Sequence, residues 1–557
     1  MIIDNVALYL QHDAGICFEY EDELYCFEME RITKKRYEQF IPMNNYNELL
    51  GKIILLRDTL MDYFDVKKIT FNKLYFNCNQ SIDRNSDVSF FLERFMKFFN
   101  IKVCEPFSHH LAHAACAYSQ SGFDETLIFS IDGGGSDENF VLEFFCIYHA
   151  SKNGIKKITE IPIDLGMIYT WASYIPVVTW TRRGTTILVG CGKFMGLSAY
   201  GSKNPSIIWK LKNSLLNNFW YDPISIYPDT NDKVKEFLRC MYETFAFEDF
   251  VNFRGTLPSE SFRNHILNFK DCATFASNMQ EMFVQVILEI IEPYIYDYDM
   301  PICVTGGVAL NVLLNERIRQ KYKKPVFVPS NPNDSGIPFG GWLLKNWDKY
   351  DKYDVVYKGW DILDRNDLNK YKKEYVNVNC SIEKLANEIV LGNIIGVVNG
   401  RSECGPRALG NRSILCDPSI PDMKDILNSK VKDREWYRPF APVVRYEDRN
   451  KYFHFDGDSP YMSFATQVRA SYHERLQAIT HVDGSARIQT VKKEQNDFLY
   501  DLLTEMERMG KIPVLLNTSF NIKGNPILTT IKDALYVLDN TKLDAVYVEG
   551  ILFTDRR

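Results

Sequence analysis

The sequence predicts an α/β fold, and two observations support that prediction. Short apolar strands that run into glycine-rich loops and then into amphipathic helices recur from the N-terminus to about residue 340. The composition is that of an ordinary globular protein, with 557 residues of which 46% are hydrophobic and 25% charged. A chain of this length is expected to form roughly two to four domains with buried cores.

The first elements are predicted in the N-terminal 135 residues. Residues 5–10 (NVALYL) indicate a strand, and residues 16–33 indicate a hairpin whose turn carries Glu21, Asp22 and Glu23. Residues 125–131 (ETLIFSI) predict a buried strand that runs into a glycine turn at 132–135.

A helix and two further strand units follow. The helix is predicted from apolar residues at helical spacing, namely Ala276, Met279, Phe283, Val286 and Ile290. Residues 301–318 read as strand, glycine turn and helix, and 325–341 as a strand followed by a proline- and glycine-rich loop.

The glycine-loop pattern ends around 350–367, and we place a boundary there, which gives domains 1–352 and 353–557. The second domain is also expected to be α/β. It contains an apolar strand at 393–400, a cationic segment at 401–438 and a strand followed by a loop at 512–526.

Charge and cysteine content exclude several classes of protein. The net charge of −7 argues against a general nucleic-acid coat. Thirteen scattered cysteines with no C-x-x-C pair indicate reduced thiols rather than a disulfide scaffold. The N-terminal residues lack a signal-peptide pattern, and no apolar run reaches the length of a membrane span. We therefore expect a cytoplasmic protein without a membrane partner.

Histidine is concentrated in one stretch, SHHLAHA. His109 and His113 are four residues apart and would share one face of a helix, which suits two imidazoles on one metal ion. Asp132 and Asp334 follow strands, where α/β folds gather ligands. Two imidazoles with one or two carboxylates suit Fe²⁺, Mn²⁺ or Zn²⁺. The alternative is that both histidines are merely packed or solvated.

Two glycine-rich stretches follow predicted strands. Gly133 and Gly134 lie in DGGG, and Gly306 and Gly307 lie in TGGVALN, which ends in Asn311. Glycine lets backbone N–H groups approach a phosphate closely. Each stretch alone is explained by a tight turn, but two in order indicate a nucleotide held between two lobes.

The cationic segment indicates a phosphate-binding region. Its cations occur in loop-like contexts beside Asn411, Ser413 and Asn428, and forked arginines with hydroxyls suit a phosphate ester. The alternative is a structural ion-pair network. The cations are Arg401, Arg407, Arg412, Lys430, Lys432, Arg434 and Arg438.

His12 and Asp13 follow the first predicted strand in LQHDAG. A histidine at this position can act as general base on a hydroxyl group, or it can simply cap the turn.

Taken together, the motifs resemble those of the O-carbamoyltransferases, which include enzymes of tobramycin, cephamycin and nodulation-factor biosynthesis. The motifs occur in the family's order over nearly the whole chain, with a divergent stretch around 203–260. They include HHLAHAACA, DGGG, GKFMGLSAYG, TGGVALN, GRSECGPRALGNRSI, NSKVKDREWYRPFAPV, THVDGSARIQTV and LLNTSFNIKGNPI.

The resemblance implies a fold for each domain and a reaction in two steps. The first domain would be actin/sugar-kinase-like (ASKHA), similar to the transferase of tRNA threonylcarbamoylation, and the second YrdC-like. Carbamoyl phosphate and ATP would form carbamoyl adenylate in the second domain. The first domain would then transfer the carbamoyl group to a hydroxyl acceptor.

The resemblance also implies residue roles. The metal ligands would be His109, His113, Asp132 and Asp334, with Fe²⁺ as the first choice of metal and Mg²⁺ accompanying ATP. The catalytic residues would be His12, Asp13, Lys432 and Arg434. Substrate and phosphate would be bound by Arg407, Arg412, Ser413, Asn428, Arg438, Asn517, Ser519 and Asn521. Nucleotide would be bound by Gly133, Gly134, Lys193, Gly306, Gly307 and Asn311.

The sequence departs from the family pattern at Cys191, where an acidic residue is usual near the Gly-Lys pair. It leaves the acceptor open among small molecules, sugars and nucleosides, and it is compatible with a homodimer. A hydroxymethylated base in DNA remains an alternative acceptor, to which the basic stretch 179–186 would contribute. Two alternatives of other classes are a sugar kinase and a non-catalytic module that binds nucleotide and iron.

Overall fold

The computed structural model describes residues 1–41, 45–78, 86–176, 178, 189–219, 237, 239–241, 243–245, 268–432, 434–522 and 524–556. The basic stretch at 179–186 lies outside these residues. The chain divides into two compact units. The first unit comprises Met1–Gly122, Ser136–Val141 and Val328–Arg557, and the second comprises Phe123–Gly135 and Leu142–Phe327. The boundary at 352/353 falls inside the first unit and stays a prediction.

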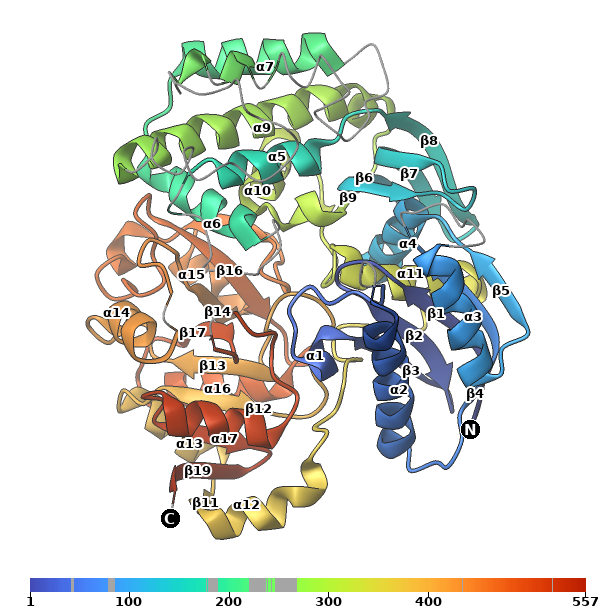
Figure 1. Cartoon of the computed structure of the whole chain (residues 1–557). Helices are drawn as coiled ribbons and strands as arrows, with labels where there is room; N and C mark the ends of the chain where they lie inside the picture. Colours follow the sequence, from blue (N-terminus) through green and yellow to red (C-terminus); the bar gives the residue numbers. More distant parts are fainter. Residues whose placement is uncertain are drawn as a thin grey trace. The chain divides into compact units, whose positions relative to one another are not determined.

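The first unit begins with a five-stranded sheet in the order β3-β2-β1-β4-β5 (Figure 1). Strands β1 to β3 are antiparallel, and β4 and β5 run parallel to β1. The strands are β1 (Ile2–Tyr9), β2 (Gly15–Tyr20), β3 (Glu23–Glu28), β4 (Thr70–Asn77) and β5 (Val103–Pro106). The predicted first strand and hairpin are confirmed, although the turn consists of Glu21 and Asp22 alone, both at positive φ.

Four helices in this part of the first unit matter for the site. Helices α2 (Tyr46–Tyr63) and α3 (Asp87–Phe99) contribute to one hydrophobic core with the sheet. Helix α4 (His109–Ser121) packs against α11 (Ile337–Leu344), and α11 also packs against β1. The crossing of α4 and α11 requires glycine, because a Cβ at Gly340 would lie 1.9 Å from the Ala112 carbonyl oxygen.

A second five-stranded sheet, in the second unit, has the order β10-β9-β6-β7-β8. This order matches that of the first sheet: β6, β7 and β8 correspond to β1, β2 and β3, and β9 and β10 correspond to β4 and β5. As in the first sheet, the two later strands run parallel to the first strand of the group. The strands are β6 (Glu125–Ser136), β7 (Leu142–Ser151), β8 (Gly154–Ile161), β9 (Ile302–Thr305) and β10 (Val326–Phe327). The glycine turn predicted at 132–135 is wrong, because β6 continues through these glycines to Ser136.

The long predicted helix of the second unit is confirmed as α9 (Phe269–Asp297), with the five apolar residues of its pattern buried or nearly so. Its neighbours include α5 (Leu165–Tyr174), α6 (Val189–Leu197) and α10 (Val312–Tyr322). None of the helices in the described part of the chain is long and apolar enough to cross a lipid bilayer.

The rest of the first unit is built on a nine-stranded mixed sheet in the order β11-β19-β18-β12-β13-β17-β14-β16-β15 (Figure 1). Helices α13 (Ile382–Val390) and α16 (Asp497–Arg508) contribute to its core. The strands are β11 (Tyr375–Asn379), β12 (Ile395–Val398), β13 (Arg412–Cys416), β14 (Ala441–Arg445), β15 (Phe464–Gln467), β16 (Ser485–Val491), β17 (Val514–Ser519), β18 (Ala545–Val548) and β19 (Ile551–Arg556). The α/β class is thus confirmed, and the strands predicted around 393–400 and 512–526 are β12 and β17.

Candidate functional site

Two histidines and one aspartate meet inside the first unit. His109 and His113 lie on the first turns of α4, whose start is capped by the Ser108 side chain. Their Nε2 atoms lie 3.6 and 3.5 Å from one carboxylate oxygen of Asp334. Both histidines are fully buried, and Asp334 is 3% exposed. The helical placement predicted for the histidine pair is therefore confirmed.

The spacing of these three atoms suits a metal ion. Two ligand atoms each about 2.1 Å from a metal, at a tetrahedral angle, lie about 3.4 Å apart. The observed nitrogen–oxygen distances of 3.5 and 3.6 Å are close to that value and too long for strong hydrogen bonds. The donor set, two neutral nitrogens and a carboxylate, suits the divalent transition metals predicted from the sequence.

Asp132 belongs to the second unit, so its place as a fourth ligand stays a prediction. One of its carboxylate oxygens accepts a hydrogen bond of 2.7 Å from the Gly133 N–H. Burial raises the pKa of the Asp164 carboxyl, in the same unit, well above its usual range. The negative charge of Asp132 raises it further.

Tyr9, at the end of β1, is a site residue that the sequence reasoning missed. Its hydroxyl donates a 2.5 Å hydrogen bond to the second carboxylate oxygen of Asp334, and its ring centroid lies 5.6 Å from that of His109. Such a bond orients a metal-ligating carboxylate. The available signal was the position of Tyr9, buried at the carboxyl end of a strand and three residues before His12.

His12 and Asp13 form the turn after β1. The Nδ1 atom of His12 lies 3.2 Å from an Asp13 carboxylate oxygen, and the same oxygen accepts a hydrogen bond from the Asn333 amide. The Nε2 atom of His12 lies 3.4 Å from an Asp334 oxygen. The His12 side chain is 39% exposed, unlike the two buried histidines. An imidazole held at one nitrogen and accessible from solvent can exchange a proton with a bound molecule.

The predicted nucleotide residues all lie in the second unit. Gly306, at φ 86°, comes so close to β6 that a Cβ would lie 2.2 Å from the Ile131 carbonyl oxygen, and a Cβ on Gly307 would lie 2.9 Å from an Asp132 oxygen. The Asn311 amide exchanges hydrogen bonds of 3.1 and 3.2 Å with Gln280, and its oxygen caps α10. These contacts give the turn a structural role that does not depend on a nucleotide.

Two further residues of the second unit lie on α6. Lys193 is 2% exposed. Cys191, at the position where an acid is usual, lies within hydrogen-bonding reach of Thr170 and Ser173, and burial raises the pKa of its thiol. The side chain at this position is therefore neutral.

The first unit brings together a group of cations, here called the cation cluster, of which Arg487 lies on a strand, β16, of the nine-stranded sheet. Burial and the neighbouring cations hold the pKa of Arg434 and of Arg487 well below their usual range, and they lower that of Arg407 to about 10. Such mutual repulsion is relieved when an anion binds. The members are Arg407, Lys432, Arg434, Arg438, Arg487 and Arg36.

The nitrogen atoms of the cation cluster differ in their hydrogen bonding. The Nε atoms of Arg434 and Arg487 are buried and have no hydrogen-bond partner among the described residues. Lys432 donates instead to the carbonyl oxygens of Ser519 and Asn521 and to the Asn521 side chain, at 2.7 to 2.8 Å. The structure thus brings Ser519 and Asn521 to Lys432.

The sequence reasoning did not place Arg487 and Arg36 in the phosphate site. Arg487 lies on β16 and Arg36 in the segment after α1 (Glu30–Thr33), both outside the cationic segment at 401–438. The motif THVDGSARIQTV contains Arg487 and was the one signal that could have found it.

Other predicted phosphate residues have structural contacts. Arg412 lies on β13 rather than in the loop-like context expected, is fully buried, and donates to the Asn399 and Asn411 carbonyl oxygens, both at 3.0 Å. Its pKa is lowered to about 10 by burial, against the opposing charge of Glu403. Ser413 accepts from the Gly410 N–H, so both side chains contact the loop that precedes β13, while the buried Nε and Nη2 atoms of Arg412 have no partner among the described residues.

Asn517 and Asn428 differ in their contacts. Asn517 donates to the Ala408 carbonyl oxygen and to Gln489. Asn428 is 7% exposed and its amide has no partner among the described residues, so it can still meet a ligand.

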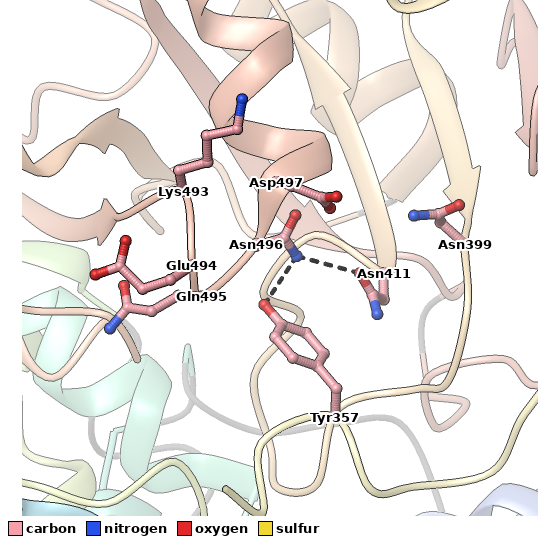
Figure 2. A pocket seen from close by; sticks show the side chains of 8 residues that line it. All are labelled: Tyr357, Asn399, Asn411, Lys493, Glu494, Gln495, Asn496 and Asp497. Atoms are coloured by element: carbon pink, nitrogen blue, oxygen red, sulfur yellow. Dashed lines mark hydrogen bonds between the residues drawn. The ribbon is translucent and has the colours of Figure 1, made fainter.

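A separate pocket of about 760 Å³ lies in the first unit (Figure 2). The Asn496 amide, at its centre in Figure 2, donates to the Tyr357 hydroxyl and to the Asn411 side chain. Of the residues named for the predicted phosphate-binding region, Asn411 lines this pocket, whose lining is Tyr357, Asn399, Asn411, Lys493, Glu494, Gln495, Asn496 and Asp497.

Comparison with known families gives two matches. Residues 91–342 match the model described as "Carbamoyltransferase N-terminus", and residues 386–555 match "Carbamoyltransferase C-terminus".

Similar curated proteins include nodulation protein NolO of Bradyrhizobium diazoefficiens, 30% identical over 479 residues that cover 81% of this chain and 79% of that protein. Nodulation protein NolNO of Sinorhizobium fredii is 31% identical over 471 residues, and the match spans 64% of that longer protein. An uncharacterized protein of Methanocaldococcus jannaschii is 27% identical over 98% of both chains.

Among solved structures, full-length HypF in its phosphate- and nucleotide-bound form covers 62% of this chain and 56% of its own, with 12% identity and a TM-score of 0.34.

Proposed function

The chain belongs to the carbamoyltransferase family, and from that premise we propose that it is an ATP-dependent O-carbamoyltransferase acting in two steps. In the first step, carbamoyl phosphate, water and ATP give carbamoyl adenylate, phosphate and pyrophosphate. In the second step, the carbamoyl group passes from the adenylate to an acceptor hydroxyl, and AMP leaves.

The cation cluster is the observation that supports this proposal most. Both phosphorylated substrates are polyanions, and burial together with repulsion between the cations lowers the pKa of Lys432, Arg434 and Arg487. Arg407, Arg434, Arg438 and Arg487 would bind the phosphates. Lys432, held by Ser519 and Asn521, would place a positive charge where charge develops on the leaving pyrophosphate.

The histidine pair and Asp334 would hold a divalent metal, Fe²⁺ first and Mn²⁺ or Zn²⁺ next, with Asp132 as the proposed fourth ligand. Such a metal supplies positive charge to the adenylate phosphate. Tyr9 orients Asp334 for that role. Mg²⁺ would accompany ATP.

We propose His12 as the base that accepts the proton of the acceptor hydroxyl. Asp13 would hold Nδ1, and Nε2, which lies 3.4 Å from Asp334, would take the proton as the carbamoyl carbon is attacked. His12→Asn is expected to form carbamoyl adenylate at the parental rate but to transfer it about 10²–10⁴ times more slowly, because a general base contributes that much. Single-turnover assays that follow intermediate and product separately measure both rates.

The matched control for this prediction is His149→Asn, which removes a partly exposed histidine from β7. Near-parental transfer by His12→Asn would assign the proton to another group. Loss of the intermediate as well would make His12 a binding or structural residue.

For the fold, we propose an ASKHA domain at 1–352, with the nucleotide contacted by Gly133, Gly134, Lys193, Gly306, Gly307 and Asn311, and a YrdC-like domain at 353–557. The repeated strand order of the two five-stranded sheets supports the first assignment. All thirteen cysteines are free thiols, which supports a reducing compartment such as the cytoplasm. We propose a homodimer, and a small-molecule, sugar or nucleoside acceptor.

The proposed function is tested by incubating the protein with ATP and carbamoyl phosphate. Pyrophosphate is expected only when both are present, because neither alone can yield the adenylate. Labelled carbamoyl phosphate, offered with a panel of hydroxylated acceptors that includes hydroxymethylated DNA, then identifies the acceptor. Absence of pyrophosphate with both substrates would contradict the first step.

A further inference from the structure

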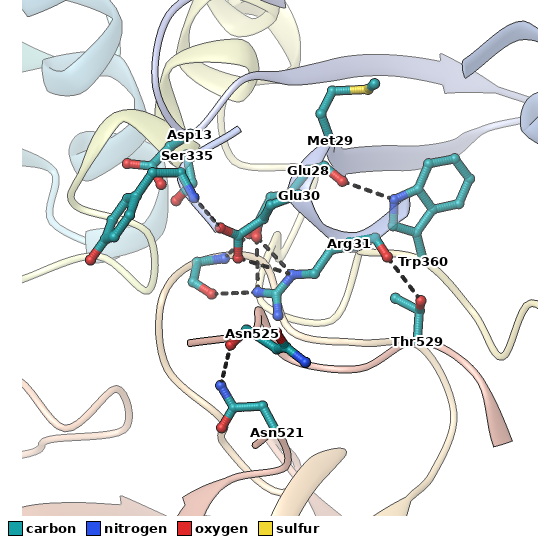
Figure 3. Close-up of polar contacts among 12 residues, drawn as sticks. Asp13, Glu28, Met29, Glu30, Arg31, Ser335, Trp360, Asn521, Asn525 and Thr529 are labelled. Atoms are coloured by element: carbon teal, nitrogen blue, oxygen red, sulfur yellow. Dashed lines mark hydrogen bonds and ion pairs between the residues drawn. The ribbon is translucent and has the colours of Figure 1, made fainter. Parts of the chain in front are cut away.

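Arg31 is a buried arginine that bonds both a near neighbour, Glu28, and a distant residue, Gly405. It is 3% exposed, and its guanidinium donates to Glu28 at 2.8 Å and to the Gly405 carbonyl oxygen at 2.9 Å (Figure 3). The other oxygen of Glu28 accepts from the Gly405 N–H at 2.6 Å. Glu28 and Arg31 together therefore hold both backbone polar groups of one residue.

On the side away from Glu28 and Arg31, Gly405 packs tightly against the backbone of Ser330 and Asn331. Its φ is 110°, and a Cβ there would lie 2.5 Å from the Ser330 carbonyl oxygen and 3.1 Å from Asn331. The loop that carries Gly405 is thus held between the Glu28–Arg31 pair and the segment that leads to Asp334.

Two further contacts fix the pair itself. The Trp360 indole N–H donates to the Glu28 carbonyl oxygen, and the Trp360 ring stacks on Phe27 at 3.7 Å between centroids. The Thr529 hydroxyl donates to the Arg31 carbonyl oxygen (Figure 3). Because the backbones of Glu28 and Arg31 are themselves fixed, the two side chains hold Gly405 in one position instead of shifting with it.

The loop held in this way leads directly into the cation cluster. Arg407 is two residues after Gly405, with only Pro406 between them, and it interacts with Arg36, Arg434, Arg438 and Arg487. Pro406 has a fixed φ, so displacement of Gly405 moves the Arg407 backbone.

The pair also borders the turn of the proposed base. The charge of Asp13 acts on both Glu28 and Glu30, and Asp13 itself binds Asn333 in the segment before Asp334. The same small region of the first unit thus contacts the His12 turn, the Asp334 segment and the Arg407 loop.

We propose that Glu28 and Arg31 are positioning residues that hold Gly405, and through it Arg407, in the geometry that binds the substrate phosphates. The inference rests on the proposed function, because it assigns a purpose to Arg407. The inference adds that residues at and just after the end of the N-terminal hairpin, more than 370 residues before Gly405, set the affinity of the cation cluster for phosphate groups.

The test measures binding of inorganic pyrophosphate to the full chain by calorimetry, for the parent, Glu28→Gln, Arg407→Ala and the double variant. A glutamine at 28 must turn an NH₂ group toward the N–H of Gly405 or toward Arg31, so one contact is lost. Glu28→Gln is expected to weaken pyrophosphate binding at least about tenfold, the effect of losing one charge-assisted hydrogen bond. In the Arg407→Ala background the same change should have little further effect, because Glu28 acts through Arg407.

Glu23→Gln is the matched control, since Glu23 lies on the same hairpin and pairs with Arg401, whereas Gly405 is bonded to Glu28 and Arg31. It should bind pyrophosphate as the parent does. Should Glu28→Gln fail to fold, Glu28→Asp keeps the charge, shortens the reach and is expected to weaken binding in the same way.

Three outcomes separate the ideas. Binding by Glu28→Gln equal to that of Glu23→Gln overturns the positioning role, as do effects of Glu28→Gln and Arg407→Ala that simply add. A parent that binds no pyrophosphate contradicts the cation cluster as a phosphate site, and with it the proposed function.

Discussion

Replacing His109 and His113 together by alanine is expected to abolish binding of the proposed metal. The two Nε2 atoms lie within 3.6 Å of Asp334, and a site left with a single carboxylate in the first unit cannot retain a transition metal. Elemental analysis of the purified protein, expressed with iron, manganese and zinc supplied, measures the loss and identifies the metal.

His110→Ala is the matched control, because His110 is equally buried on the same helix but lies outside the ligand group. It should keep the metal. Tyr9→Phe removes the hydrogen bond to Asp334 and is expected to weaken metal affinity by about 10–100-fold, the usual cost of losing a contact that orients a ligand. A double variant with parental metal content, or equal loss in His110→Ala, would remove the ligand assignment.

Replacing Arg434 or Arg487 by alanine is expected to lower carbamoyl-phosphate-dependent formation of pyrophosphate by about 10²–10³-fold, as loss of one preorganised donor does in other enzymes. Each arginine carries a buried Nε without a partner among the described residues. The measurement is the initial rate of pyrophosphate release at saturating ATP.

The same variants have a second expected result, in stability. Arg434 helps to lower the pKa of Lys432 and of Arg487, so removing either arginine relieves repulsion between cations. The melting temperature without ligand should be unchanged or higher, and the rise caused by pyrophosphate should be lost. Arg412→Ala should instead lower the melting temperature, because Arg412 is buried and bonded to the backbone.

Lys493→Ala is the control for this series, since it removes an exposed lysine that pairs with Asp501 and lines the separate pocket. Its pyrophosphate release should match that of the parent. Parental rates in Arg434→Ala and Arg487→Ala would mean that the cation cluster has another role.

The sequence by itself determined the α/β class, the first strands and the pairing of His109 with His113. These depend on local chemistry: alternation and glycine define strands and their ends, and a spacing of four residues places two side chains on one face of a helix. Asp334 was found for a similar reason, because it follows a strand. The carbamoyltransferase family was also accessible, since its motifs are continuous in sequence.

Only the tertiary structure decided which side chains meet. Arg36 and Arg487 join the cation cluster from outside the cationic segment, whereas Arg412, inside it, is bonded to the Asn399 and Asn411 backbone. The repeated strand order of the two five-stranded sheets was likewise invisible, because backbone hydrogen bonding leaves no fixed residue pattern. Glu28, Arg31 and Gly405 show the same limit: their contact closes a loop of more than 370 residues, and no local preference encodes it.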